Sequence, residues 1–333
     1  MPPTMRSVAI NSYSEPAKFE LNLPVPSISS PTDVLIRVHA ASINPGDLTL
    51  ASGMTRLMFP VEFTYKVGHD LSGTVVQVGA GVTDVVVGDD VYTNLPVAYA
   101  GSHLFLCLAR SKSQEFIRLQ STFAKSFPGS ASEYALTSSK KLALKPISLS
   151  HVEAASLPCV AIITMQAFDS ANSAIPGGLL GKTIFVPAGL SGTGSIALQF
   201  AKHVYRAAKV ITTVSTSKLP KIRQLLGEDT VDQIVDYTKE DVLKKVEKGS
   251  VDFLYDTVGT GMAHLPLMKP NSGIIVSISN LPSGRVTARV FPRTPWILKR
   301  IFDAVDFWNR KRAGRWSVKW EMSFDVGESK RSG

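Results

Sequence analysis

Apolar and polar positions follow two different periodicities along the chain. Residues 34–91 contain short segments, such as DVLIRVHAASI and GTVVQVGAGV, in which apolar residues alternate or run together between Gly and Asp turns. Such segments are typical of β-strands joined by tight turns. Residues 132–144 continue this pattern as far as Pro146. The pattern predicts a small barrel-like β domain over residues 1–150.

Helical spacing begins at residue 150, where Ser150 and Glu153 predict a helix cap with a capping box. After Gly181 the segments alternate between strand and helix, beginning with KTIFVPA and TGSIALQFAKHV. Strands that are joined by crossover helices form a parallel sheet. Residues 151–333 are therefore predicted to form a doubly wound α/β domain, which makes the whole chain α/β in class.

The first strand of this second part leads into a glycine-rich turn that opens a helix. Gly189, Gly192 and Gly194 lie here, with Ser191 and Thr193 among them. A diphosphate reaches the backbone N–H groups of a helix N-terminus only where no side chain blocks its approach. We therefore predict a dinucleotide site in preference to a tight turn that binds nothing.

The stretch after the next strand indicates which dinucleotide is bound. NAD sites usually place an Asp or Glu there to hold the ribose hydroxyls. This chain has no carboxylate in that stretch; its residues are Ser215, Thr216, Ser217 and Lys218. Hydroxyls and an ammonium group hold a 2′-phosphate through charge-assisted hydrogen bonds. The stretch therefore predicts NADP(H) rather than NAD(H).

Composition narrows the environment of the protein. Of its 333 residues 44% are hydrophobic and 19% are charged, which is ordinary for a globular chain of two domains. Its two cysteines, Cys107 and Cys159, form neither a disulfide framework nor a paired metal motif. The first residues lack the apolar core of a signal peptide, and no apolar run is long enough to span a membrane. We expect a cytoplasmic protein with no membrane partner.

The net charge of +9 raises the question of nucleic acid as a partner. Much of the positive charge is local and lies near the end of the chain, at Lys299, Arg300, Arg310, Lys311, Arg312, Arg315 and Lys319. No recognised nucleic-acid module accompanies these residues, so a solvated surface is favoured over a nucleic-acid site.

Several motifs then agree with one another. SINPGDLTLASG (residues 42–53), VGHDLSGTVVQVGAGVTDVVVGDDVY (67–92) and GSASEYALTSSKKLALKP (129–146) are followed in order by EAASLP, AGLSGTG and DFLYDTVG. In these motifs the chain resembles medium-chain dehydrogenase/reductases, most closely the zinc-independent quinone oxidoreductase and enoyl reductase branch. The resemblance covers residues 7–279 with one interruption. It implies a GroES-like β-barrel catalytic domain and a Rossmann domain, with the active site in the cleft between them.

The resemblance also implies roles for individual residues. Asn44 and Asp47 are the implied catalytic residues near the nicotinamide, which Thr164 helps to hold. Tyr237 is placed beside the adenosine phosphate with Ser215 and Lys218, and Val258 is counted with the cofactor-binding residues. Two structural alternatives stay open, since Asp47 could cap a turn and Tyr237 could be an exposed strand end.

The zinc-dependent members of this superfamily bind a catalytic metal through three protein ligands. Here Asn44 stands where the first ligand, a cysteine, would be, whereas His69 is retained and Cys159 lies near the third position. A catalytic zinc needs three protein donors and a water, and an amide is a poor donor. We therefore predict no metal. His69 is interpreted as a polar group in the cleft, and Cys159 as a small buried hydrophobe.

Without a Lewis acid, alcohol oxidation is hard, whereas hydride transfer to an activated double bond is easier. The leading hypothesis is an NADPH-dependent reductase of quinones or α,β-unsaturated carbonyls, serving small-metabolite biosynthesis. Asn44 would supply a hydrogen bond to the developing oxyanion. A small-molecule substrate and a homodimer are expected. The alternatives are a zinc-dependent alcohol dehydrogenase and a non-catalytic nucleotide- or RNA-binding member of the fold.

Two segments depart from the family pattern. Residues 97–127 stand where relatives pass quickly to the next motif, and a lid, an oligomer contact and translated non-coding sequence all remain open. Near the end, residues 318–326 predict one strand, after which the sequence soon ends. The last sheet strands and the returning helix are therefore expected to be missing, which leaves the activity of this copy open.

Overall fold

The computed structural model describes residues 3–58, 60–95, 129–280 and 282–322. The atypical segment 97–127 lies outside these residues, as do the last four positions of the predicted strand 318–326. The chain divides into two compact units, Met1–Cys159 with Ala288–Pro295 and Val160–Thr287 with Trp296–Gly333. The sequence-based domain boundary at residue 150 stays a prediction.

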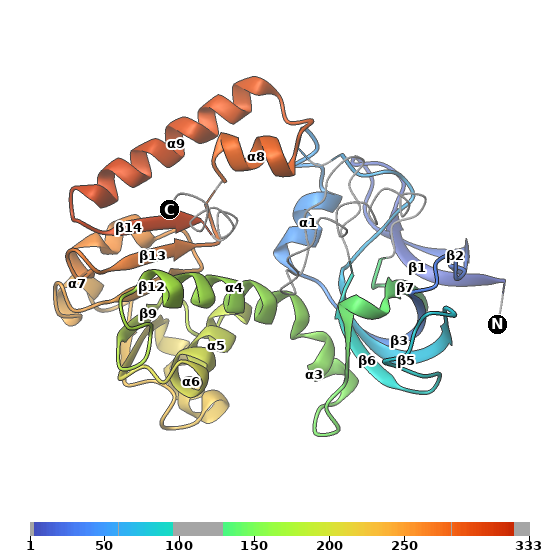
Figure 1. The fold of residues 1–333 in the computed structure, drawn as a ribbon, viewed down its shortest axis with the longest axis horizontal. Coiled ribbons are helices and arrows are strands. Elements are labelled where there is room, and N and C mark those ends of the chain that lie inside the picture. The colour runs from blue at the N-terminus through green and yellow to red at the C-terminus, as the bar shows by residue number, and fades with distance from the viewer. Residues whose placement is uncertain (1–2, 59, 96–128, 281, 323–333) are drawn as a thin grey trace. The chain divides into compact units, whose positions relative to one another are not determined.

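The first unit is built from antiparallel β-structure (Figure 1). Its larger sheet has the strand order β7-β3-β5-β6-β8, and all of its pairs are antiparallel. These strands are β3 (Asp33–Ser42), β5 (Asp70–Val78), β6 (Asp90–Asn94), β7 (Tyr134–Ser138) and β8 (Leu142–Leu144). A smaller sheet has the order β2 (Lys18–Pro24), β1 (Thr4–Ile10) and β4 (Tyr65–Lys66).

The core of this unit follows from the two-residue period of its strands. Val34 and Ile36 on β3 point to the same face, where Leu71 and Val75 of β5 and Val91 of β6 meet them, and all five are buried. The short helix α1 (Pro45–Ala51) follows β3. The N-terminal β domain that the sequence predicts is confirmed.

The second unit contains a six-stranded sheet in which every strand pair is parallel. Its strand order is β11-β10-β9-β12-β13-β14, so the direction of progression reverses beside β9. The strands are β9 (Thr183–Val186), β10 (Lys209–Val214), β11 (Gln233–Asp236), β12 (Phe253–Asp256), β13 (Ile274–Ser277) and β14 (Lys319–Met322). This is the doubly wound Rossmann order. The predicted parallel sheet is confirmed.

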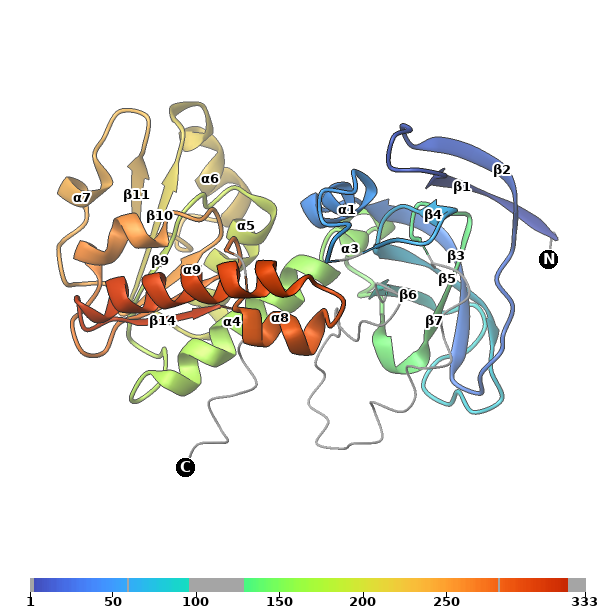
Figure 2. The same ribbon diagram turned by 90° about the horizontal axis from the view of Figure 1, so that it is seen from above.

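Hydrophobic clusters cover both faces of the parallel sheet. Ile184 and Val186 of β9 pack on one face and Phe185 on the other, because successive side chains of a strand point in opposite directions. Helices α4 (Pro158–Ala174), α5 (Gly192–Gln199) and α6 (Leu219–Leu226) contribute to the first cluster. Helices α7 (Val242–Lys245) and α9 (Trp296–Gly314) contribute to the second. Figure 2 shows α9 running alongside β14.

Local chemistry determines where several helices begin and end. Ser150 and Glu153 form the predicted capping box at the start of α3 (His151–Ala155). The helical stretch does not run on from there, because proline lacks an N–H and suits the first turn of a helix; α4 begins anew at Pro158. Helix α7 begins at Val242 because the Asp241 side chain accepts the N–H of Leu243 and caps the helix there.

Further helical segments of the described residues include the 3₁₀ helices Ser139–Lys141 and Gly261–Leu267. Helix α5 continues as a π-helical turn, Phe200–Val204, and helix α8 (Gly284–Val290) precedes α9. In the described part of the chain, no helix is long and apolar enough to cross a membrane.

Candidate active site

The three glycines after β9 have different physical roles. A Cβ atom on Gly189 would overlap the side chain of Thr212 on β10, and one on Gly194 would overlap the carbonyl of Ala188. These two glycines let the turn close against its own neighbours. At Gly192 the nearest atom to a Cβ would be Cγ1 of Val160, 3.8 Å away. Gly192 therefore leaves the face of the turn open.

The first turn of α5 presents unused backbone donors beside that open face. The hydroxyl of Ser191 caps the helix by accepting the N–H of Gly194 at 3.0 Å. The N–H groups of the first helical residues have no acceptor inside a helix, and the described residues give none to Gly192 or Thr193. Two N–H groups at the positive end of a helix dipole suit a diphosphate.

The stretch after β10 forms a short 3₁₀ turn, Thr216–Lys218, that leads into α6. Ser215 lies 3.3 Å from Ser217, hydroxyl to hydroxyl, and Lys218 is exposed. The end of β11 joins this stretch because Tyr237 donates its N–H to the carbonyl of Val214 at 3.2 Å. The structure therefore brings Tyr237, whose side chain is 56% exposed, to the same sheet edge as Ser215 and Lys218.

A carboxylate that the sequence analysis missed also lies at this edge. Asp236, the last residue of β11, accepts a hydrogen bond from the Thr216 hydroxyl at 2.5 Å. This bond, with those from Thr238, lowers the pKa of the Asp236 carboxyl, which is therefore anionic at neutral pH. This carboxylate comes from β11, whereas the sequence prediction concerned the stretch after β10. Asp236 directly precedes Tyr237 at the end of the neighbouring strand, and this sequence position could have predicted a carboxylate at the same sheet edge.

Thr164 and Val258 lie on separate elements of the second unit. Thr164, on α4, is fully buried, and its hydroxyl has no hydrogen-bond partner among the described residues. Val258 follows β12 and is 46% exposed. The neighbouring Thr257 donates to the carbonyl of Pro187 at 3.0 Å, which ties the end of β12 to the glycine turn.

In the first unit, Asn44 and Asp47 occupy the start of α1. The carboxylate Oδ2 of Asp47 accepts the N–H of Asn44 at 2.7 Å, and its Oδ1 contacts Nδ1 of His69. Asp47 and His69 are both buried. Asp47 therefore caps the helix, as the structural alternative proposed, and also orients an imidazole.

Asp70, next to His69, is a second functional candidate that the sequence analysis missed. Its carboxylate accepts hydrogen bonds from the amides of Asn44 and Asn94, each at 2.8 Å, and from the backbone N–H of Cys159 at 3.1 Å. Burial raises the pKa of Asp70 from 3.8 to about 6, although the bonds from Asn94 and Asn44 oppose the rise. One N–H of the Asn44 amide is thereby committed to Asp70, and the other is left for a different acceptor.

The described residues contain no group of three or more His, Cys, Asp or Glu side chains that could hold a metal ion. His69 is directed to Asp47, and Asp70 is surrounded by amide donors. The arrangement therefore does not supply the three ligands that a catalytic zinc requires.

The chain is similar to a known domain family and to several named proteins. Residues 30–147 match the alcohol dehydrogenase GroES-like domain. The chain is 31% identical to a 2-methylene-furan-3-one reductase of Solanum lycopersicum over 94% of its own length and 78% of that protein. It is 30% identical to an NADPH-dependent alkenal/one oxidoreductase of Arabidopsis thaliana, a chloroplastic protein, over 92% of this chain and 77% of that one.

Among solved structures, the quinone oxidoreductase of Coxiella burnetii superimposes with a TM-score of 0.67 at 25% identity, covering 96% of this chain and 82% of that one. The fold and the relatives together define the class of protein. The chain belongs to the medium-chain dehydrogenase/reductase superfamily, in its quinone oxidoreductase and enoyl reductase branch. The family resemblance predicted from the motifs is confirmed.

Proposed function

We propose that the protein is an NADPH-dependent reductase that transfers hydride to a quinone or to the β-carbon of an α,β-unsaturated carbonyl. The open face at Gly192, beside unused N–H groups at the start of α5, is the observation that carries the proposal. The names of the relatives, an alkenal/one oxidoreductase and a furanone reductase, support the same chemistry.

The residues of the second unit fit an NADP(H) molecule. The open face, the unused N–H groups and the orphaned hydroxyl of Thr164 are features that a bound dinucleotide would satisfy. When bound, this cofactor supplies hydride chemistry. Three sets of residues would hold it: Gly189, Ser191, Gly192, Thr193 and Gly194 at the diphosphate, Ser215, Thr216, Ser217, Lys218 and Tyr237 at the 2′-phosphate, and Thr164 and Val258 along the rest of the molecule.

In the first unit, Asn44 and Asp47 are the proposed catalytic residues. The second N–H of the Asn44 amide would donate to the oxyanion that develops on a carbonyl substrate. Asp47 would hold Asn44 and His69 in place through its two oxygens. No observation on the described residues favours the zinc-dependent or the nucleic-acid alternative.

The proposal is tested by following NADPH absorbance with the purified full chain and a panel of quinones and enones. We expect substrate-dependent oxidation of NADPH that is faster than that of NADH at equal concentration. A preference for NADH would contradict the cofactor assignment. Tight NADPH binding without turnover of any panel member would contradict the reductase assignment.

Three broader expectations remain proposals: cytoplasmic residence, a homodimer and a role in small-metabolite biosynthesis. The first two are testable without a substrate. Fractionation of cells that express the tagged protein reports its compartment. Sedimentation equilibrium of the purified chain reports whether its mass is 35.9 kDa or twice that value.

A further inference from the structure

The carboxyl ends of β10 and β11 carry two loops that lie next to each other. Val214 and Asp236 are register partners in the parallel pair, so the residues that follow them leave the same sheet edge. We call residues 215–218 the β10 loop and residues 237–240 the β11 loop. The β10 loop holds the hydroxyls and the lysine assigned to the 2′-phosphate, and the β11 loop begins with Tyr237.

Asp236 is hydrogen-bonded to both loops at once. Its Oδ2 accepts the Thr216 hydroxyl of the β10 loop at 2.5 Å. Its Oδ1 accepts the backbone N–H of Thr238 at 3.0 Å and the Thr238 hydroxyl at 2.6 Å. Its backbone carbonyl accepts the N–H groups of Lys239 at 3.0 Å and Glu240 at 2.8 Å, which curls the β11 loop back over the strand end.

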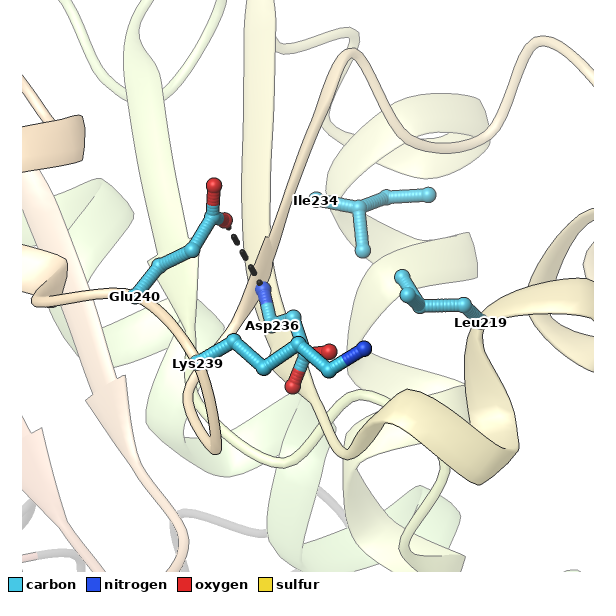
Figure 3. Close-up of a pocket in the computed structure, with 5 residues that line it drawn as sticks. All are labelled: Leu219, Ile234, Asp236, Lys239 and Glu240. Atoms are coloured by element: carbon cyan, nitrogen blue, oxygen red, sulfur yellow. Dashed lines mark hydrogen bonds between the residues drawn. The ribbon is translucent and has the colours of Figure 1, made fainter.

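Asp236 lines a small pocket in which apolar and charged side chains surround its carboxylate (Figure 3). Leu219 and Ile234 form an apolar side, and the Lys239 side chain extends past Asp236 toward Leu219. The positive charge of Lys239 also contributes to the lowered pKa of Asp236. Glu240 accepts the Asp236 N–H at 3.3 Å. Each charge in this small region therefore has an opposite charge or a donor close by.

We propose that Asp236 is the positioning residue of the 2′-phosphate site, holding the two loops so that Ser215, Lys218 and Tyr237 act on one phosphate. The inference rests on the proposed use of NADP(H). It also reassigns Thr216, whose hydroxyl is directed to Asp236 and so acts through that residue rather than on the phosphate itself.

A carboxylate so close to a phosphate site needs a physical reason. In NAD sites a carboxylate at the end of the second strand accepts ribose hydroxyls. Asp236 instead ends β11, the third strand of the parallel sheet along the chain. Three hydrogen bonds from Thr216 and Thr238 occupy most of its roughly four acceptor positions. The order it imposes on the loops must therefore outweigh the repulsion that its charge exerts on the ligand. These two effects have opposite signs, so they can be separated by substitution.

The test measures how strongly the full-length protein distinguishes 2′,5′-ADP from 5′-AMP by isothermal titration calorimetry. The ratio used is the dissociation constant of 5′-AMP divided by that of 2′,5′-ADP. It isolates the 2′-phosphate, because both probes share the adenosine and the 5′-phosphate. We expect Asp236→Ala to lower this ratio about tenfold, as lost charge-assisted hydrogen bonds would. Thr216→Val removes the bond to Asp236 and the 2.8 Å contact with the Thr238 hydroxyl but keeps the two bonds from Thr238 to Asp236, so it is expected to lower the ratio less. Asp236→Asn, which keeps an acceptor oxygen, is expected to recover part of the loss.

Asp232 provides a matched control in the same unit. Its Oδ2 accepts the N–H of Val210 at 2.7 Å, and the carboxylate pairs with Lys202 at 2.9 Å. Asp232 therefore joins β10 and β11 at their amino ends, away from the proposed phosphate site. Asp232→Asn is expected to lower the melting temperature and to leave the ratio unchanged. If a loss of stability alone lowered the ratio, the Asp232 and Asp236 variants would lower it to the same extent.

The possible results separate the inference from the function on which it rests. A wild-type ratio near one would refute the NADP(H) preference and, with it, the positioning role. A large wild-type ratio that Asp236→Ala and Thr216→Val leave unchanged would refute the positioning role alone. An increase of the ratio in Asp236→Asn would also overturn it, because repulsion would then be the dominant effect.

Discussion

The imidazole Nδ1 of His69 contacts Oδ1 of Asp47, and both side chains are buried. The other carboxylate oxygen accepts the N–H of Asn44 at 2.7 Å. One carboxylate therefore fixes both the start of α1 and the ring that precedes β5. His69, which corresponds to a metal ligand in the zinc-dependent members of the superfamily, is here paired with Asp47 instead.

Asp47→Ala is expected to destabilise the protein by about 2–4 kcal/mol, because it leaves the buried His69 ring and the partly buried N–H of Asn44 without their acceptor. Urea denaturation measures the loss. Thr49→Ala, on the same helix, removes an exposed hydroxyl that donates to the carbonyl of Pro45 and should change stability by less than about 0.5 kcal/mol. Equal losses in the two variants would contradict the role of the buried pair.

Asp70 is expected to make the folded state less stable as pH rises. Its pKa is raised from 3.8 to about 6, so the folded protein holds this proton more tightly than the unfolded chain does. Its contribution is most favourable below pH 4 and is lost as pH rises through about 6, with a total change of about 3 kcal/mol. Denaturation midpoints measured from pH 4 to 7 test this.

Asp70→Asn cannot ionise and should reduce that pH dependence. Asp84, which is exposed, supplies the control, since Asp84→Asn should leave the slope as it is in the wild type. If Asp70→Asn keeps the full slope, another group is responsible for it.

The glycines of the turn should respond differently to alanine. Gly192→Ala has room and should leave the melting temperature nearly unchanged, but its methyl group would occupy the open face and weaken NADPH binding about tenfold or more. Gly194→Ala would overlap the Ala188 carbonyl and should cost about 1–3 kcal/mol of stability. Thermal denaturation and fluorescence titration with NADPH measure the two effects. Unchanged affinity in Gly192→Ala would exclude this face as the diphosphate site.

Asn44→Ala is expected to lower kcat about tenfold to a hundredfold by removing an oxyanion donor, with a smaller effect on KM. The same substitution also removes a hydrogen bond to Asp70, so Asn94→Ala is the matched control because Asn94 donates to the other oxygen of that carboxylate. Steady-state kinetics on both variants distinguish the two causes. Equal losses of kcat would show that Asn44 acts through Asp70 alone.

The sequence was sufficient for features that depend on neighbouring residues. The strand β9, the glycine turn and the capping box of Ser150 and Glu153 are all local, and the structure contains each of them. The parallel sheet followed from the βα alternation, because strands that are joined by crossover helices run parallel. The family motifs then predicted the GroES-like domain and the reductase branch, which periodicity alone does not indicate.

The contacts of Asp236 and Asp70 could not be predicted in this way. Thr216 and Asp236 are separated by 20 positions, and Asn44 and Asp70 by 26. Their meeting depends on strand register and on side-chain direction, which a single sequence does not specify. Helix α9 was also missed, because its buried positions, such as Phe302 and Ala313, are few among charged and exposed apolar residues.

The unequal roles of the three glycines have a consequence for descendants of this chain that lose their coenzyme. Selection for a folded domain would still retain Gly189 and Gly194, because bulk at either position collides with the protein itself. Gly192 alone would then be released to drift. A glycine-rich motif can therefore persist after coenzyme binding is lost. The residue at the middle position, Gly192, indicates whether a ligand still binds.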